Sequence, residues 1–285
     1  MDRIKITECP RDAMQGLHDF IDTDTKAEYI NLLLQLGFDT IDFGSFVSPK
    51  AIPQMRDTAD VLNKLNLDNS DSNLLAIVAN DRGAIDAVSH DEITYLGYPF
   101  SISEEFQKRN TGKGIDESLH LLESIQNICS INNKTLVVYL SMAFGNPYNE
   151  PWNADIAAKW SERLITELDV KHLALSDTIG VSNRENITQL FKTLIPAFPD
   201  TNIGAHLHTN PNDWLEKVEA AYAAGCRLFD GAIKGFGGCP MAKDDLVGNM
   251  PTEKLIEFAN NNGIETSVSN EKLKLVMDMA AKIMG

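Results

Sequence analysis

The chain has 285 residues, of which 43% are apolar, and its 25 basic and 41 acidic residues leave a formal net charge of −16. This length suits one α/β barrel or two small domains. No apolar run reaches the roughly 20 residues that cross a bilayer, so the sequence predicts no membrane protein. The acidity argues against nucleic-acid binding, because phosphate backbones need a basic surface.

The cysteines and the amino-terminal segment indicate a reducing compartment. Cys9, Cys129, Cys226 and Cys239 lie far apart and make neither a disulfide framework nor paired CxxC zinc motifs. The first twenty residues carry arginine and acidic residues where a signal peptide has an apolar centre. We therefore expect a cytoplasmic protein.

Short apolar strands alternate with amphipathic helices along the whole chain. The first half predicts strands over residues 4–7, 40–43, 74–78 and 92–96. It predicts helices over residues 25–36, 55–65 and 84–88. A capping-box sequence at Thr25 begins the first of these helices, and Gly37 can terminate it.

The second half continues this alternation. It predicts strands over residues 135–140, 172–175, 203–208 and 228–232. It predicts helices over residues 116–128, 155–168, 186–194, 215–224, 252–260 and 272–283. About eight strands alternating with helices favour a (β/α)₈ TIM barrel. A doubly wound open sheet is the alternative fold, but it is less consistent with the sequence because no GxGxxG motif follows the first strand. We expect one domain over residues 1–285, with carboxyl-terminal helices at about 252–285 packing on the barrel.

A His-x-His pair ends one of the expected strands. His206 and His208 are two residues apart, so both side chains point to one face while the apolar residues between and before them point to the other. A single buried histidine is more often a hydrogen-bonded core residue. Two of them at the end of a barrel strand favour a metal site.

Further polar residues follow other strands. Asp12 could complete a metal site with the histidines, and Arg11 supplies a fixed positive charge beside it. Asp177, followed by Thr178, is a candidate for catalysis, for support of a neighbouring ligand or for helix capping. Asp42 ends the second strand on the face opposite its apolar neighbours.

A glycine-rich segment, GFGGCPMAKDDLVGN, follows the last expected strand. Its glycines permit close backbone approach and movement, which are common next to active sites. Cys239 in this segment is the candidate reactive thiol. We expect Cys9, Cys129 and Cys226 to act as small apolar core residues.

The segments PRDAMQ, SFVSPKAIPQM, SEEFQKRNTGKGIDESL, LSDTIGV, HLH and GFGGCP resemble those of the hydroxymethylglutaryl-CoA lyase family, in the same order and over nearly the whole chain. The resemblance implies a metal-dependent TIM barrel that cleaves 3-hydroxy-3-methylglutaryl-CoA into acetyl-CoA and acetoacetate. SFVSPK, IPQM and GGCP are specific to the lyase branch and argue against the related isopropylmalate and homocitrate synthases. A homodimer and a role in leucine degradation are also implied.

The resemblance assigns roles to individual residues. The implied ligands of a divalent cation are Asp12, His206, His208 and Asn249. Such oxygen and imidazole ligands fit Mg²⁺ or Mn²⁺, with Zn²⁺ as an alternative. Arg11 would stabilise an enolate, Cys239 would take part in proton transfer, and Asp177 would assist near the substrate hydroxyl.

The remaining candidates would contact the substrate or CoA. These residues are Gln15, Ser45, Lys108, Arg109 and Thr178. Lys108 and Arg109 stand in an expected loop where they could meet CoA phosphates, although surface basic residues usually have no such specific role.

The sequence departs from the family pattern at four places. Asp42, a further candidate catalytic residue, replaces the usual Glu, so we expect a hydrogen bond to Arg11 or the substrate to be lost or bridged by water. The residues after Arg11-Asp12 and those after HLH also differ. The segment between Cys239 and Asn249 looks one residue longer and contains Asp244 and Asp245, either of which is an alternative cation ligand.

Three hypotheses follow. The first is an active hydroxymethylglutaryl-CoA lyase, since Arg11 and the implied cation ligands are all present. The second is the same reaction on a different 3-hydroxy-3-alkyl acyl-CoA. The third, from a different class, is a non-catalytic barrel that binds an acyl-CoA or a metal.

Overall fold

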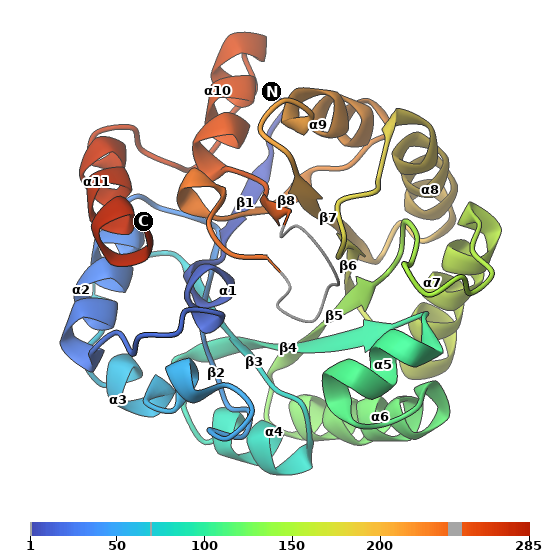
Figure 1. Cartoon of the computed structure of the whole chain (residues 1–285), viewed down its shortest axis with the longest axis horizontal. Helices are drawn as coiled ribbons and strands as arrows, with labels where there is room; N and C mark the ends of the chain where they lie inside the picture. The colour runs from blue at the N-terminus through green and yellow to red at the C-terminus, as the bar shows by residue number, and fades with distance from the viewer. Residues whose placement is uncertain (1, 69, 239–246) are drawn as a thin grey trace.

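The structure is a computed structural model and describes residues 2–68, 70–238 and 247–285. Parallel strands form a sheet in the order β6-β5-β4-β3-β2-β1-β8-β7, and pairing of β6 with β7 closes it into a barrel. In Figure 1 the strands form a ring at the centre of the molecule, and the helices surround it. The expected (β/α)₈ barrel is confirmed.

The strands and helices alternate in the order expected from the sequence. The barrel strands are β1 (Lys5–Glu8), β2 (Thr40–Ser45), β3 (Asn73–Ile77), β4 (Ile93–Ser101), β5 (Thr135–Ser141), β6 (His172–Asp177), β7 (Asn202–Thr209) and β8 (Leu228–Gly231). The main helices are α2 (Thr23–Leu34), α3 (Thr58–Leu62), α4 (Asp81–Val88), α6 (Ile115–Ile131), α7 (Ala154–Leu168), α8 (Arg184–Ala197), α9 (Trp214–Ala223), α10 (Thr252–Asn262) and α11 (Leu273–Met284).

Several elements differ from the expectation. The helix expected over 55–65 is split into a 3₁₀ turn, η1 (Pro53–Met55), and the short α3. The short helices α1 (Pro10–Gln15) and α5 (Glu104–Thr111) were not expected. Two small elements after β8 were also missed, the 3₁₀ turn η2 (Ile233–Gly235) and the two-residue strand β9 (Gly248–Asn249).

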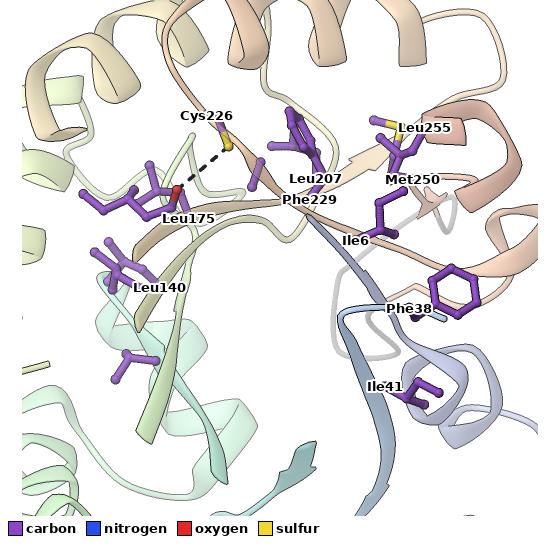
Figure 2. Close-up of a cluster of buried hydrophobic side chains, with 14 of the residues drawn as sticks. Ile6, Phe38, Ile41, Leu140, Leu175, Leu207, Cys226, Phe229, Met250 and Leu255 are labelled. Carbon is purple, nitrogen blue, oxygen red and sulfur yellow. Dashed lines mark hydrogen bonds between the residues drawn. The ribbon is translucent and has the colours of Figure 1, made fainter. Parts of the chain in front are cut away.

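The main apolar core lies between the strands and the outer helices. Ile6, Ile41, Leu175 and Phe229 are strand residues of this core, and Leu255 of α10 belongs to the same buried cluster (Figure 2). A second, smaller cluster consists of Leu75, Ile77, Tyr139 and Ala174. These residues alternate along their strands with members of the main core, which is the pattern of a barrel whose interior is filled by side chains.

The carboxyl-terminal helices pack against the barrel. α10 contacts β8 and α9, and α11 lies beside α2 on the outside of the molecule (Figure 1). None of the described helices has the length and apolarity needed to cross a bilayer.

Candidate functional site

Both ends of the barrel contain polar residues, and only one end gathers the residues singled out above. At the amino ends of the strands, a cavity of about 120 Å³ is lined by strand-initial residues such as Lys5, Thr40, Asn73 and His172. At the other end, Arg11 and Asp12, which follow β1, converge with Asp42 of β2 and with the two histidines of β7. Active sites of TIM barrels lie at this second end.

The two histidines of β7 lie side by side, as their spacing predicts. Their ring centroids are 5.4 Å apart, whereas the intervening Leu207 belongs to the outer core. Asp12 joins them, and one potential ligand atom from each of the three residues lies within 4.8 Å of the others. Asp12 reaches this position because Pro10 starts α1 directly after β1, where its fixed φ and missing N–H suit a first helical turn.

The carboxylate of Asp12 is oriented by three donors. Its Oδ1 accepts hydrogen bonds from Arg11 Nη1 at 2.9 Å and from Gln15 Nε2 at 2.6 Å. Its Oδ2 accepts one from Asn249 Nδ2 at 2.8 Å. The pKa of Asp12 is lowered, because Arg11 and the two histidines outweigh the effect of burial. Asp12 is therefore held as an anion.

Asn249 enters the site through β9. This strand pairs antiparallel with β7, and the pairing sets Asn249 opposite His208. The amide nitrogen of Asn249 donates to Asp12 and, at 2.9 Å, to the carbonyl of Phe236. Because both amide hydrogens are used, the side-chain oxygen is the atom left to bind a cation.

Gly237 allows this close packing. Its φ is +91°, and a Cβ there would lie 2.7 Å from Asp12 O and 2.8 Å from Asn249 Nδ2. A side chain would therefore displace two of the residues that line the site.

The two histidines are held differently. His206 Nδ1 lies 3.1 Å from Asp230 Oδ2, so Nε2 is the ring nitrogen that could bind a cation, as in the carboxylate–histidine pairs that support metal ligands. His208 Nδ1 is buried and has no hydrogen-bond partner among the described residues. A buried polar atom without a partner is costly, and a bound cation nearby would remove that cost.

Their pKa values move in opposite directions. Burial and the neighbouring His206 lower the pKa of His208 to about 4, so its ring is neutral near pH 7. Burial also acts to lower the pKa of His206, but the hydrogen bond and charge of Asp230 outweigh it and raise this pKa. Asp12, Asn249 and a neutral imidazole fit a divalent cation.

Arg11 and Asp42 form a direct pair, which corrects the expectation of a lost or water-bridged bond. Arg11 Nε donates to Asp42 Oδ2 at 3.0 Å, and Arg11 Nη2 donates to the same oxygen at 2.5 Å. The shorter carboxylate suffices because α1 packs against β2 and brings the guanidinium close to Asp42. Burial raises the pKa of Asp42 to about 6 despite the charge of Arg11. Asp42 thus fixes Arg11 beside Asp12.

The carboxylate of Asp177 is fully engaged at the end of β6. It accepts hydrogen bonds from the main-chain nitrogens of Val181 and Ser182, from the Ser182 hydroxyl and from Lys217 Nζ. The neighbouring Thr178 accepts a hydrogen bond from Met142 N at 3.0 Å.

Two of the residues expected to contact CoA belong to α5, the helix that follows β4. Lys108 and Arg109 stand in the last turn of α5 rather than in a loop, and they pair with Glu104 and Glu105. This placement corrects the expectation: the i,i+4 acid–base spacing supports a helix there. Ser45 donates to Ile77 O and lines a separate cavity of about 290 Å³.

Some candidates lie outside the described residues. These are Cys239, Asp244 and Asp245.

The sequence did not single out two residues that contact the site. Asp230 follows outward-facing Phe229 on β8, so alternation alone could have indicated it. Lys217 lies within a helix and carries no comparable signal. Cys9 is buried, as expected, but it also lies beside His206 and Asp230.

Comparisons with known proteins agree with this geometry. The family model described as HMGL-like matches residues 3–280. The chain is 33% identical over 267 residues to the hydroxymethylglutaryl-CoA lyase YngG of Bacillus subtilis (strain 168), which covers 93% of this chain and 87% of the relative. It is 31% identical to the cytoplasmic 3-hydroxy-3-methylglutaryl-CoA lyase of Rattus norvegicus, over 98% of this chain and 80% of the relative.

A solved structure is similar over the same extent. It is an HMG-CoA lyase from Acinetobacter baumannii in complex with coenzyme A and 3-methylmalate, with a TM-score of 0.92 and 28% identity. The match covers 100% of this chain and 92% of that one. The chain therefore belongs to the HMGL-like family.

Proposed function

We propose that the protein cleaves 3-hydroxy-3-methylglutaryl-CoA into acetyl-CoA and acetoacetate. The observation that carries this proposal is the cluster of Asp12, His206, His208 and Asn249 with Arg11 beside it, at the carboxyl end of the barrel. Proteins that share the family and the fold are named for this activity.

We propose Mg²⁺ or Mn²⁺ as the cofactor, with Zn²⁺ as the alternative. Asp12, His206, His208 and the side-chain oxygen of Asn249 would hold it. When bound, such a cation lowers the pKa of a substrate hydroxyl and orients the bond that breaks. Arg11, Asp12 and Asp42 together carry one positive and two negative charges, and the net negative charge favours a cation at this site.

The reaction is a retro-Claisen cleavage. The tertiary hydroxyl loses its proton, and the C2–C3 bond breaks. The products of this step are acetoacetate and the enolate of acetyl-CoA. The enolate then takes up a proton to give acetyl-CoA. Negative charge develops on the thioester oxygen, and Arg11 is the fixed cation proposed to stabilise it. Asp42 keeps the guanidinium in place. Cys239 remains our candidate for the proton transfer.

Other residues would bind or position the substrate. Gln15 adjoins Asp12, while Ser45 lies at the end of β2 and Thr178 follows β6. Lys108 and Arg109 remain candidates for the CoA phosphates, on the exposed side of α5. Asp177 fits a supporting role better than substrate contact, because its oxygens are already occupied.

The finer expectations from the sequence complete the proposal. They are a cytoplasmic homodimer, one domain over residues 1–285, and a role in leucine degradation.

The test is acetoacetate release from 3-hydroxy-3-methylglutaryl-CoA by reduced protein with Mg²⁺ or Mn²⁺, with an EDTA control. We expect turnover within the usual enzyme range of about 1–10³ s⁻¹, abolished by EDTA. No turnover on this substrate, with turnover on a longer 3-hydroxy-3-alkyl acyl-CoA, would replace the substrate and keep the chemistry. Failure on every acyl-CoA would favour a non-catalytic binding protein.

A further inference from the structure

We infer that Lys217 is a positioning residue for the cation site, acting through the main chain of His208 and through Asp177. The inference rests on the proposed function, since it presupposes a divalent cation at that site. Lys217 lies on α9, outside the barrel strands, and its side chain is 4% exposed. A lysine is rarely this buried unless its charge is paired.

The ammonium of Lys217 uses all its donors on one small region. Its Nζ donates to Asp177 Oδ2 at 2.9 Å, to Gly180 O at 3.1 Å and to His208 O at 2.7 Å. A lysine has three N–H donors, so this set satisfies it. The three acceptors belong to the end of β6, the turn after it and the end of β7. One side chain therefore joins two neighbouring strands at the edge that carries the site.

Asp177 is saturated in the same way. Val181 N donates to its Oδ1 at 2.8 Å, Ser182 N donates to its Oδ2 at 3.0 Å, and Lys217 and the Ser182 hydroxyl also donate to Oδ2. A carboxylate has about four acceptor positions. Asp177 thus anchors Lys217 and the turn after β6, and has no oxygen to spare for a substrate.

His208 depends on this anchor more than His206 does. Asp230 orients the ring of His206 directly. The ring of His208 has an unpartnered Nδ1 within the described chain, so its main chain must fix its place. Lys217 holds its carbonyl and pairing with Asn249 holds the other side of its strand. Lys217 thereby positions His208 through its main chain, whereas Asp230 positions His206 through its ring.

Stability alone gives no reason for such a pair. Replacing a buried ion pair with apolar residues is often neutral or stabilising, whereas removing one partner leaves the other charge buried and unpaired. A single Lys217 variant and a double variant that also neutralises Asp177 can therefore separate folding from cation binding.

The chain offers a matched control. Lys26 is a second buried lysine, with a side chain 2% exposed, and it pairs with Asp57 at 2.6 Å. Within the described chain its other hydrogen-bond acceptor is the carbonyl of Gln54, and its ammonium makes no hydrogen bond to a proposed cation ligand. Lys26→Met removes a buried ion pair of the same kind away from the site.

The experiment measures the Mn²⁺ dissociation constant of metal-free protein by the EPR signal of free Mn²⁺. We expect Lys217→Met to weaken Mn²⁺ binding about 10- to 100-fold, the range for groups that orient metal ligands, and Lys26→Met to leave it within about twofold. The double variant Lys217→Met/Asp177→Asn should regain much of the urea unfolding midpoint that the single variant loses, and it should still bind Mn²⁺ weakly. If Lys217→Met fails to fold, the double variant supplies the measurement.

Each other outcome is decisive. Mn²⁺ affinity near that of the wild type in a folded Lys217 variant would overturn the inference, as would an equal loss in Lys26→Met or a wild-type protein that binds no Mn²⁺. A third outcome separates the two proposals. If the wild type cleaves no acyl-CoA but Lys217→Met still weakens Mn²⁺ binding, the result contradicts the proposed reaction and supports the role of Lys217.

Discussion

At the scale of single residues, Arg11 is held from two sides in the candidate site. It contacts Asp12 on one side and Asp42 on the other, and its side chain is 9% exposed. Since the guanidinium is planar and forked, two carboxylates can fix it in one orientation. That orientation is what a preorganised donor to a developing oxyanion requires.

Arg11→Met should therefore abolish most turnover. We expect kcat to fall at least about 10²- to 10³-fold, the typical effect of removing one such donor. Steady-state assays of acetoacetate release will measure it, and Mn²⁺ binding by EPR will show that the site is still formed. Arg163→Met, an exposed residue of α7 paired with Glu167, is the control. Retention of most of the wild-type kcat by Arg11→Met would contradict the role of Arg11.

Glu8 makes the stability depend on pH. It is fully buried, accepts hydrogen bonds from Ile233 N and Thr252 Oγ1, and burial raises its pKa from 4.5 to about 8. The folded state thus binds a proton more tightly than the unfolded state. The resulting stabilisation is complete below the unfolded pKa and is lost as the pH rises through 8.

Glu8→Gln should remove that dependence. In the wild type we expect the free energy of unfolding to fall by up to about 1.4 kcal/mol per pH unit between 5 and 8 because of Glu8. Urea unfolding at pH 5, 7 and 9 will measure it. Glu167→Gln on the exposed face of α7 should behave as the wild type does. An unchanged slope in Glu8→Gln would show that Glu8 is not the titrating group.

At the scale of elements, the sequence predicts the barrel strands well, and the small connections poorly. Alternation along the strand of His206 and His208 predicts both their shared face and the burial of Leu207. α5 was missed because Phe106 is the only apolar residue in EEFQKRNT, which leaves too weak a periodicity.

β9 shows why part of the site cannot be predicted from local patterns. It has two residues, and its partner β7 lies about forty positions earlier, so no local period marks it. The resemblance to a family pointed to Asn249 without explaining its place. The antiparallel pairing with His208 supplies that explanation.

Gly237→Ala should weaken cation binding through this region. The added Cβ would meet Ala13 Cα and Asn249 Nδ2, both at 2.8 Å, and displace Asn249 from Asp12. We expect the Mn²⁺ dissociation constant to rise about tenfold or more. Gly263→Ala is the matched control, because its φ is also positive, at +66°, and its Cβ would meet no atom within 4 Å. Equal effects of the two changes on Mn²⁺ binding would contradict the steric explanation.

At the scale of the whole molecule, the proposed ligands come from segments far apart in the sequence. Asp12 lies near the amino terminus, the histidines lie on β7, and Asn249 follows β8. The unfolded chain does not hold these residues together. A cation that binds them should therefore stabilise the folded barrel.

Mn²⁺ should raise the melting temperature. At about 100 times the dissociation constant, binding adds about 2.7 kcal/mol, which corresponds to a rise of several degrees in a chain of this size. Thermal unfolding with and without Mn²⁺ will show it, and His206→Gln should remove the rise. His172→Gln, at the opposite end of the barrel, should keep it. A rise of equal size in His206→Gln would place the cation elsewhere.

Asn249 also has a second partner, the carbonyl of Phe236, at the start of the segment that ends with β9. The nitrogen of this amide group thus holds the carbonyl of Phe236, and by the proposal above its oxygen binds the cation. Linkage is reciprocal for binding free energies. Whatever strengthens the hydrogen bond from Asn249 to Phe236 O should therefore tighten cation binding, and the cation should strengthen that hydrogen bond to the same degree.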